Sequence, residues 1–110
     1  MADIREARAA VVRRVLEGDG ESSRVQRRGA FDDAELAEPL GTLMHKVALH
    51  SSRVTAKDID ALRATGMSED QIFELVVCAA LGQANRQYET AMAALDAVSN
   101  GSEHAPRDSR

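Results

Sequence analysis

At 110 residues the chain is long enough for one domain with a hydrophobic core, but not for two. Its net charge of -4 conceals an asymmetry, because residues 1–28 carry seven arginines against five acids and residues 29–104 carry five bases against twelve acids. The acidic body argues against a nucleic-acid surface, no stretch approaches the ~20 apolar residues of a membrane span, and a single cysteine excludes an internal disulfide. These features predict a soluble, cytoplasmic protein that does not bind membranes.

The first predicted element is an amphipathic helix over residues 2–17, which ends where Gly18 and Gly20 follow. Its arginines allow an alternative function, in which this helix docks on an acidic protein partner. Residues 18–30 hold three glycines and two serines, and we interpret them as a loop. Arg24, Arg27 and Arg28 could form an anion site there, although a solvated loop is the simpler interpretation.

Phe31 looks like an apolar anchor before a short helical turn over residues 34–38, which Pro39 interrupts. A second helix is expected from Leu40 to about Ser51. Two capping boxes with hydrophobic staples then predict two more helix starts, in the segments Val54–Ile59 and Met67–Ile72. The first of these helices is short, from Thr55 to Ala64, and stops before Gly66.

The stretch from Ser68 to Leu95 is predicted to form one long helix, against which the rest of the chain packs. Its first half is apolar nearly all the way round and therefore needs cover on two sides. At ~1.5 Å per residue it would be roughly 40 Å long, more than a compact domain of this size can cover. We therefore expect a homo-oligomer, with Phe73, Val77, Leu81 and Tyr88 in the interface. Residues 99–110 are expected to be a disordered tail, which leaves residues 1–98 as the domain.

Few residues carry recognisable chemistry. Lys46, His50 and Arg53 could line a polar cleft that binds a small acidic substrate, whereas an exposed or packed histidine at a helix end is the simpler interpretation of His50. His45 and His50 lie about 140° apart around a helix, so we expect no metal site. Cys78, among apolar neighbours, is expected to be a buried structural thiol.

A helix, a turn and a second helix around Gly66 also suggest a DNA-binding helix-turn-helix. The second helix begins with Glu69 and Asp70, followed by Glu74, which DNA phosphates would repel. We therefore expect no nucleic-acid partner.

The segment RVTAKDIDALRATGMSEDQIFELVVCAALGQANR resembles the core of the alkylhydroperoxidase D-like (carboxymuconolactone decarboxylase-like) superfamily. The resemblance extends loosely over residues 1–98 and includes VLEGDG and RRGAF. It implies an all-α fold of four to five helices and a homo-oligomer whose subunits meet along these helices.

Catalytic members of that superfamily carry a CxxC pair, a histidine four residues later and a glycine eight residues after the histidine. Counted back from Gly66, the histidine position holds Asp58, the second cysteine position Val54 and the first cysteine position Ser51. The family's upstream glutamate falls on Pro39, next to Glu38. Dithiol peroxidase activity is therefore expected to be absent.

The leading hypothesis is a non-redox, homo-oligomeric binding or accessory protein without a cofactor. The alternative is an enzyme of the carboxymuconolactone decarboxylase-like type that uses a non-thiol pocket. In that case His50 and Glu38 are the candidate catalytic residues.

Overall fold

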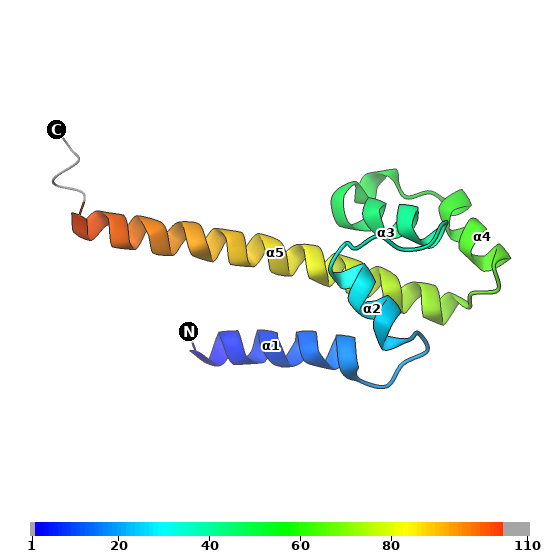
Figure 1. The fold of residues 1–110 in the computed structure, drawn as a ribbon, viewed down its shortest axis with the longest axis horizontal. Helices are drawn as coiled ribbons and strands as arrows, with labels where there is room; N and C mark the ends of the chain where they lie inside the picture. Colours follow the sequence, from blue (N-terminus) through cyan, green and yellow to red (C-terminus); the bar gives the residue numbers. More distant parts are fainter. Residues whose placement is uncertain (1, 105–110) are drawn as a thin grey trace.

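The computed structural model describes residues 2–104, which form five α-helices and a short 3-10 helix and contain no strand (Figure 1). The elements are α1 (Ala2–Glu17), α2 (Arg24–Phe31), α3 (Leu40–Leu49), η1 (Ser51–Arg53), α4 (Ala56–Ala64) and α5 (Glu69–His104). The predicted all-α fold with one long C-terminal helix is confirmed.

Both predicted capping boxes are present. At α4 the Thr55 hydroxyl accepts a hydrogen bond from the Asp58 amide, and the Asp58 carboxylate accepts one from the Thr55 amide at 2.9 Å. At α5 the Ser68 amide donates to Gln71 Oε1 at 2.9 Å, and the Gln71 amide donates to Ser68 Oγ at 3.1 Å. These reciprocal bonds satisfy amides that the first turn of a helix leaves without partners.

The hydrophobic core surrounds the first three turns of α5, where Leu75, Cys78 and Ala79 are fully buried. Helix α2 lies across this part of α5, and α3 and α4 cover a further side (Figure 1). Ile72 of α5 also belongs to the core, and the remaining core residues come from all the other α-helices: Leu16, Ala30, Phe31, Leu40, Leu43, Met44 and Leu62. The apolar first half of α5 is thus partly covered by its own subunit.

The predicted loop is present over residues 18–23 but wrong for residues 24–30, because α2 begins at Arg24. The Ser23 side chain caps it by accepting a hydrogen bond from the Gln26 amide at 3.1 Å. Arg27, Ala30 and Phe31 then form a buried face at helical spacing. The residue composition of the segment indicates a loop, but the cap and this buried face determine its structure.

The expected helical turn over residues 34–38 is also wrong. Asp33 adopts a positive φ of 53°, which takes the chain out of α2. Residues 34–37 have no regular structure, although Leu36 packs against the core.

Helix α5 continues to His104, so the predicted disorder is wrong for residues 99–104. Extending an existing helix costs little, since each added residue also adds a hydrogen bond. Residues 105–110 of the predicted tail lie outside the described part of the chain.

The molecule is elongated, with extents of 62 × 29 × 19 Å (Figure 1). Its radius of gyration is 18.1 Å, against about 13 Å for a compact domain of this length. Its accessible surface is 7412 Å², against about 5,900 Å² for a compact monomer of 11.9 kDa. Much of this extended shape comes from α5, whose second half projects beyond the helices that pack on its first half (Figure 1).

Candidate functional site

The residues that the sequence singled out for chemistry line one cleft at the end of α3. The cleft has a volume of 340 Å³ and contains Glu38, Lys46, His50 and Arg53. Glu38 precedes α3, Lys46 lies in its last turn, His50 follows it and Arg53 ends η1. The structure therefore brings together all four predicted residues of this group.

Two of these four side chains already have strong partners. Lys46 Nζ lies 2.9 and 3.0 Å from the two carboxylate oxygens of Asp58, and this hydrogen bond is the main reason why the Asp58 pKa is lowered. Glu38 accepts hydrogen bonds from the Thr42 hydroxyl at 2.7 Å and the Thr42 amide at 3.0 Å, which lower its pKa. A carboxylate held in its ionised form is a poor general acid near neutral pH.

Within residues 2–104, His50 and Arg53 are thus the charged or ionisable groups of the cleft that have no strong partner. His45 is engaged elsewhere, with its Nδ1 3.1 Å from Asp33 Oδ1. Its ring centroid lies 6.3 Å from that of His50 in an edge-to-face arrangement. Within residues 2–104 no group of three histidine, cysteine or acidic side chains could hold a metal ion. The geometry suits anion binding better than acid/base catalysis.

The positions at which the sequence resemblance would place a redox centre have other roles here. Ser51 begins η1, Val54 packs partly against the core, and Asp58 completes the α4 capping box and pairs with Lys46. Cys78 is the single thiol of the chain, so two thiols cannot form a disulfide within one subunit.

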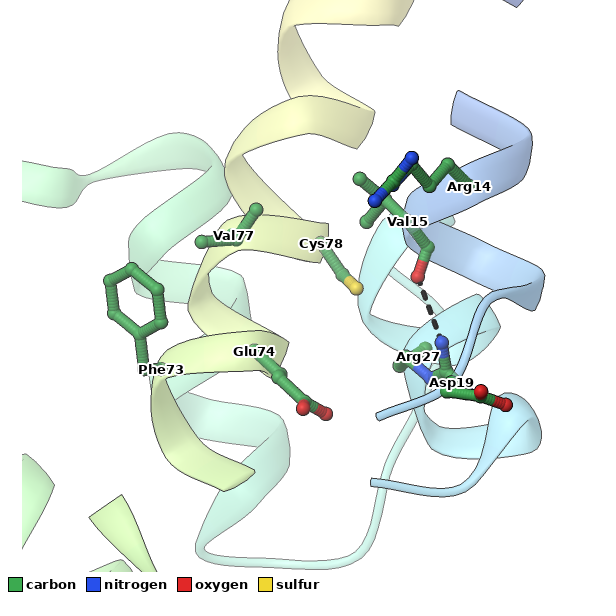
Figure 2. A pocket seen from close by; sticks show the side chains of 8 residues that line it. All are labelled: Arg14, Val15, Asp19, Arg27, Phe73, Glu74, Val77 and Cys78. Atoms are coloured by element: carbon green, nitrogen blue, oxygen red, sulfur yellow. Dashed lines mark hydrogen bonds between the residues drawn. The ribbon is translucent and has the colours of Figure 1, made fainter. Parts of the chain in front are cut away.

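A second cavity lies between α1, the α1–α2 loop and α5 (Figure 2). Its volume is 260 Å³. Its lining combines apolar side chains, two arginines, two acids and the thiol: Val15, Phe73, Val77, Arg14, Arg27, Asp19, Glu74 and Cys78.

Arg27 reaches this cavity from α2 and is only 5% exposed. Its Nη1 donates to the carbonyl oxygens of Val15 at 3.0 Å and Gly18 at 2.7 Å, and its Nε donates to that of Ser22 at 3.2 Å (Figure 2 shows the bond to Val15). These bonds fix the end of α1 and the loop after it, since the last carbonyls of a helix have no partner within the helix.

Glu74 holds the same loop from the opposite side. Its carboxylate oxygens accept hydrogen bonds from the amides of Glu21 at 2.6 Å and Ser22 at 2.8 Å. Burial alone would raise the pKa of Glu74, but these bonds and the charge of Arg27 outweigh it and lower the pKa. Glu74 is therefore an ionised structural group.

Cys78 is fully buried, and Figure 2 shows its sulfur directed toward α1 and α2. Burial raises the pKa of the thiol, and the positive charge of Arg27 opposes this only in part. A thiol with a raised pKa is a weak nucleophile at neutral pH. The expected burial of Cys78 is confirmed.

A third feature is an exposed apolar stripe along α5, which we call the α5 seam. Its members alternate at spacings of four and three residues, the heptad pattern by which helices pack together in coiled coils. They are Phe73, Val77, Ala80, Ala84, Gln87, Ala91, Ala94 and Val98. At 3.6 residues per turn they stay within about 60° of one line, on the side of α5 away from Leu75 and Gly82.

The α5 seam is uncovered within the subunit. Phe73 is 68% and Val98 65% exposed, Val77 is half-buried and the five residues between them are exposed. Of the other expected interface residues, Leu81 packs partly against the subunit's own core. Tyr88 lies beneath the guanidinium of Arg8, which is 4.3 Å from its ring centroid.

Sequence reasoning missed the cavity of Arg27 and the regular spacing of the α5 seam. The pattern Ser23-x-x-Gln26 is a capping-box signal and could have revealed α2. The spacing of the seam is present in the sequence but is obscured by its many alanines, which also occur on the other faces of α5.

The fold and these sites define an all-α protein with a long C-terminal helix that carries an exposed heptad stripe. No protein-family model, curated protein or solved structure matches the chain. Among the described residues, no helix combines the length and the apolar character needed to cross a membrane.

Proposed function

We propose that this chain is the subunit of a cytoplasmic homo-oligomer that acts as a non-redox binding or accessory protein. The observation that carries the proposal is the exposed α5 seam. A second copy of α5 has the same heptad spacing and can pack its own seam against this one. The absence of a second cysteine from the sequence supports a role without dithiol chemistry.

The size of the uncovered surface supports a second copy as the occupant. The accessible surface exceeds that of a compact 11.9 kDa monomer by roughly 1,500 Å². A standard interface buries about 800 Å² on each partner. The excess is therefore large enough to supply one subunit's share of a stable interface.

The charge pattern beside the seam also favours pairing of identical helices. Between residues 76 and 98 the flanking positions are uncharged: Val76, Leu81, Gln83, Tyr88, Thr90 and Leu95. Two copies can therefore approach without the repulsion that like charges would cause. The alanines allow close contact, and Gln87 is the single polar member of the seam, as in coiled coils where one such residue fixes the register.

The assembly is tested by a matched pair of substitutions in α5. We expect the wild type to be multimeric and Ala91→Glu, on the seam, to shift the mass to the 11.9 kDa monomer, because a buried unpaired charge costs several kcal/mol. Multi-angle light scattering over a range of concentrations measures this.

Ala93→Glu is the control, since Ala93 is equally exposed but lies on the opposite side of α5. This variant should keep the wild-type mass, and both variants should keep the helical circular dichroism signal. A monomeric wild type, or equal masses for the two variants, would rule out assembly through the seam.

The α3–η1 cleft supports a second candidate function, the binding or conversion of a small acidic substrate. The specific observation is that Lys46, His50 and Arg53 share one cavity with Glu38. Because Asp58 already neutralises Lys46, Arg53 would supply most of the attraction for an anion.

Succinate is a suitable probe for this cleft. We expect Arg53→Ala and His50→Ala to weaken succinate binding several-fold in a calorimetric titration. Both side chains are exposed, so the free energy of unfolding should change by no more than about 0.5 kcal/mol. Lys57→Ala, an exposed cation outside the cleft, is the control. Equal succinate affinity in all three variants and the wild type would exclude the cleft.

A further inference from the structure

The cavity of Figure 2 contains a buried cation that forms no direct ion pair among the described residues. Arg27 is 5% exposed, yet among residues 2–104 it forms no ion pair with any carboxylate. Arginines are almost never this deeply buried without an anionic partner. Its three hydrogen bonds all go to neutral carbonyl oxygens, and the ionised Glu74 acts on its charge without forming a direct ion pair.

One donor group of Arg27 is also free to form a hydrogen bond with a ligand. Nε and Nη1 make the three bonds to carbonyl oxygens, whereas Nη2 has no hydrogen-bond partner in the described part of the chain. Nη2 is also not fully enclosed. Among the described residues, the side-chain nitrogen that is both fully enclosed and without a hydrogen-bond partner is Arg8 Nε, so the unpartnered Nη2 of Arg27 must retain some accessible surface. Arg27 lines the cavity, so Nη2 is the donor group of its guanidinium that a ligand there could use.

The rest of the lining sets the chemistry of that ligand. Val15, Phe73 and Val77 provide apolar walls, and Arg14 adds a second positive charge. The carboxylates of Glu74 and Asp19 repel negative charge, and this repulsion is twice as strong for a dianion as for a monoanion. Binding pockets commonly combine such apolar walls with a few fixed polar groups, and 260 Å³ lies just below their usual range of about 300–1,000 Å³.

We infer that this cavity binds a small monocarboxylate with an apolar body, whose carboxylate pairs with Arg27 Nη2 and whose body lies against Val15. The ligand would supply the direct ion-pair partner that Arg27 lacks among the described residues. A phosphate dianion fits less well, because Glu74 and Asp19 repel the additional charge. The site lies within one subunit and is separate from the α3–η1 cleft.

Benzoate and its neutral analogue benzamide test this site directly. In an NMR titration of the full chain, benzoate should shift the Nε–H signal of Arg27 and the amide signal of Cys78 in a saturable way. Benzamide has the same ring without the charge and should bind at least about tenfold more weakly, a difference of ~1.4 kcal/mol.

Two neighbouring exposed arginines of α1 give a matched pair of variants that leaves the core intact. Arg14 lines this cavity, whereas Arg13 lines the groove between α1 and the second half of α5. Arg14→Gln should weaken benzoate binding several-fold, and Arg13→Gln should leave it unchanged.

The titration is repeated in Ala91→Glu, so that failure of the assembly and failure of this site can be told apart. Because Arg14, Val15 and Arg27 all lie outside the α5 seam, benzoate should bind this variant as well. Equal affinities for benzoate and benzamide, shifts confined to the residues of the α3–η1 cleft, or no saturable shift at millimolar benzoate would each overturn the inference.

Discussion

Replacing Gly82 with alanine is expected to lower the free energy of unfolding by roughly 2–4 kcal/mol. A Cβ atom at this position would lie 1.8 Å from the carbonyl oxygen of Phe31 and 2.6 Å from its carbonyl carbon. Both are backbone atoms of α2, so the whole helix must move away from α5. The same Phe31 carbonyl accepts a hydrogen bond from Arg86 Nη1 at 2.6 Å, which this movement would strain. The higher helix propensity of alanine returns only about 1 kcal/mol.

Gly29→Ala is the matched control for this effect. A Cβ atom there would meet the end of the Leu36 side chain, 2.7 Å away, which can rotate aside. Because alanine has the higher helix propensity, the free energy of unfolding of this variant should stay within about 1 kcal/mol of the wild-type value. Urea unfolding followed by circular dichroism measures both. A Gly82→Ala protein as stable as Gly29→Ala would mean that α2 does not pack on α5 as closely as the structure shows.

The sequence predicted the elements whose signals are local. Two helix starts were predicted from capping boxes of four residues each, formed by Thr55 with Asp58 and by Ser68 with Gln71. Both starts are confirmed. Helix α2 was missed because the three glycines and three arginines of residues 18–30 are typical of a loop, although Ser23 carries a capping signal. The close contact of Gly82 with Phe31 joins residues far apart in the chain, and no local pattern encodes it.

The candidate sites differ in the same way. Lys46, His50 and Arg53 lie within eight residues on one helix and the turn after it, so their shared cleft could be predicted from spacing. The pairing of Lys46 with Asp58, which removes most of its charge from the cleft, depends on how α4 packs beside α3. The cavity of Arg27 draws on α1, α2 and α5 together, and the burial of that arginine is a property of the tertiary structure alone.

Arg27 is the second position at which a large effect on stability is expected. Its side chain connects the carbonyls of Val15, Gly18 and Ser22, and charged hydrogen bonds of this kind contribute about 1.5–3 kcal/mol each. Replacement by methionine keeps an unbranched side chain of similar length but leaves the three acceptors without their donor. Relief from burying a charge offsets part of the loss. The expected net decrease in the free energy of unfolding is roughly 2–4 kcal/mol.

Arg27→Met should also shift acid unfolding to higher pH, through Glu74. In the wild type the lowered pKa of Glu74 contributes stability above the pKa of the unfolded chain, and this contribution disappears as the pH falls through the folded-state pKa. Arg27 is one cause of that lowered pKa, so its loss raises the folded-state value and reduces the contribution. Urea unfolding at a series of acidic pH values measures both effects. Arg28→Met is the control, because Arg28 is exposed and its ion pair with Asp32 lies on the surface. An Arg27→Met protein that matches Arg28→Met in stability and in acid midpoint would show that the buried guanidinium does not hold α1 and its loop in place.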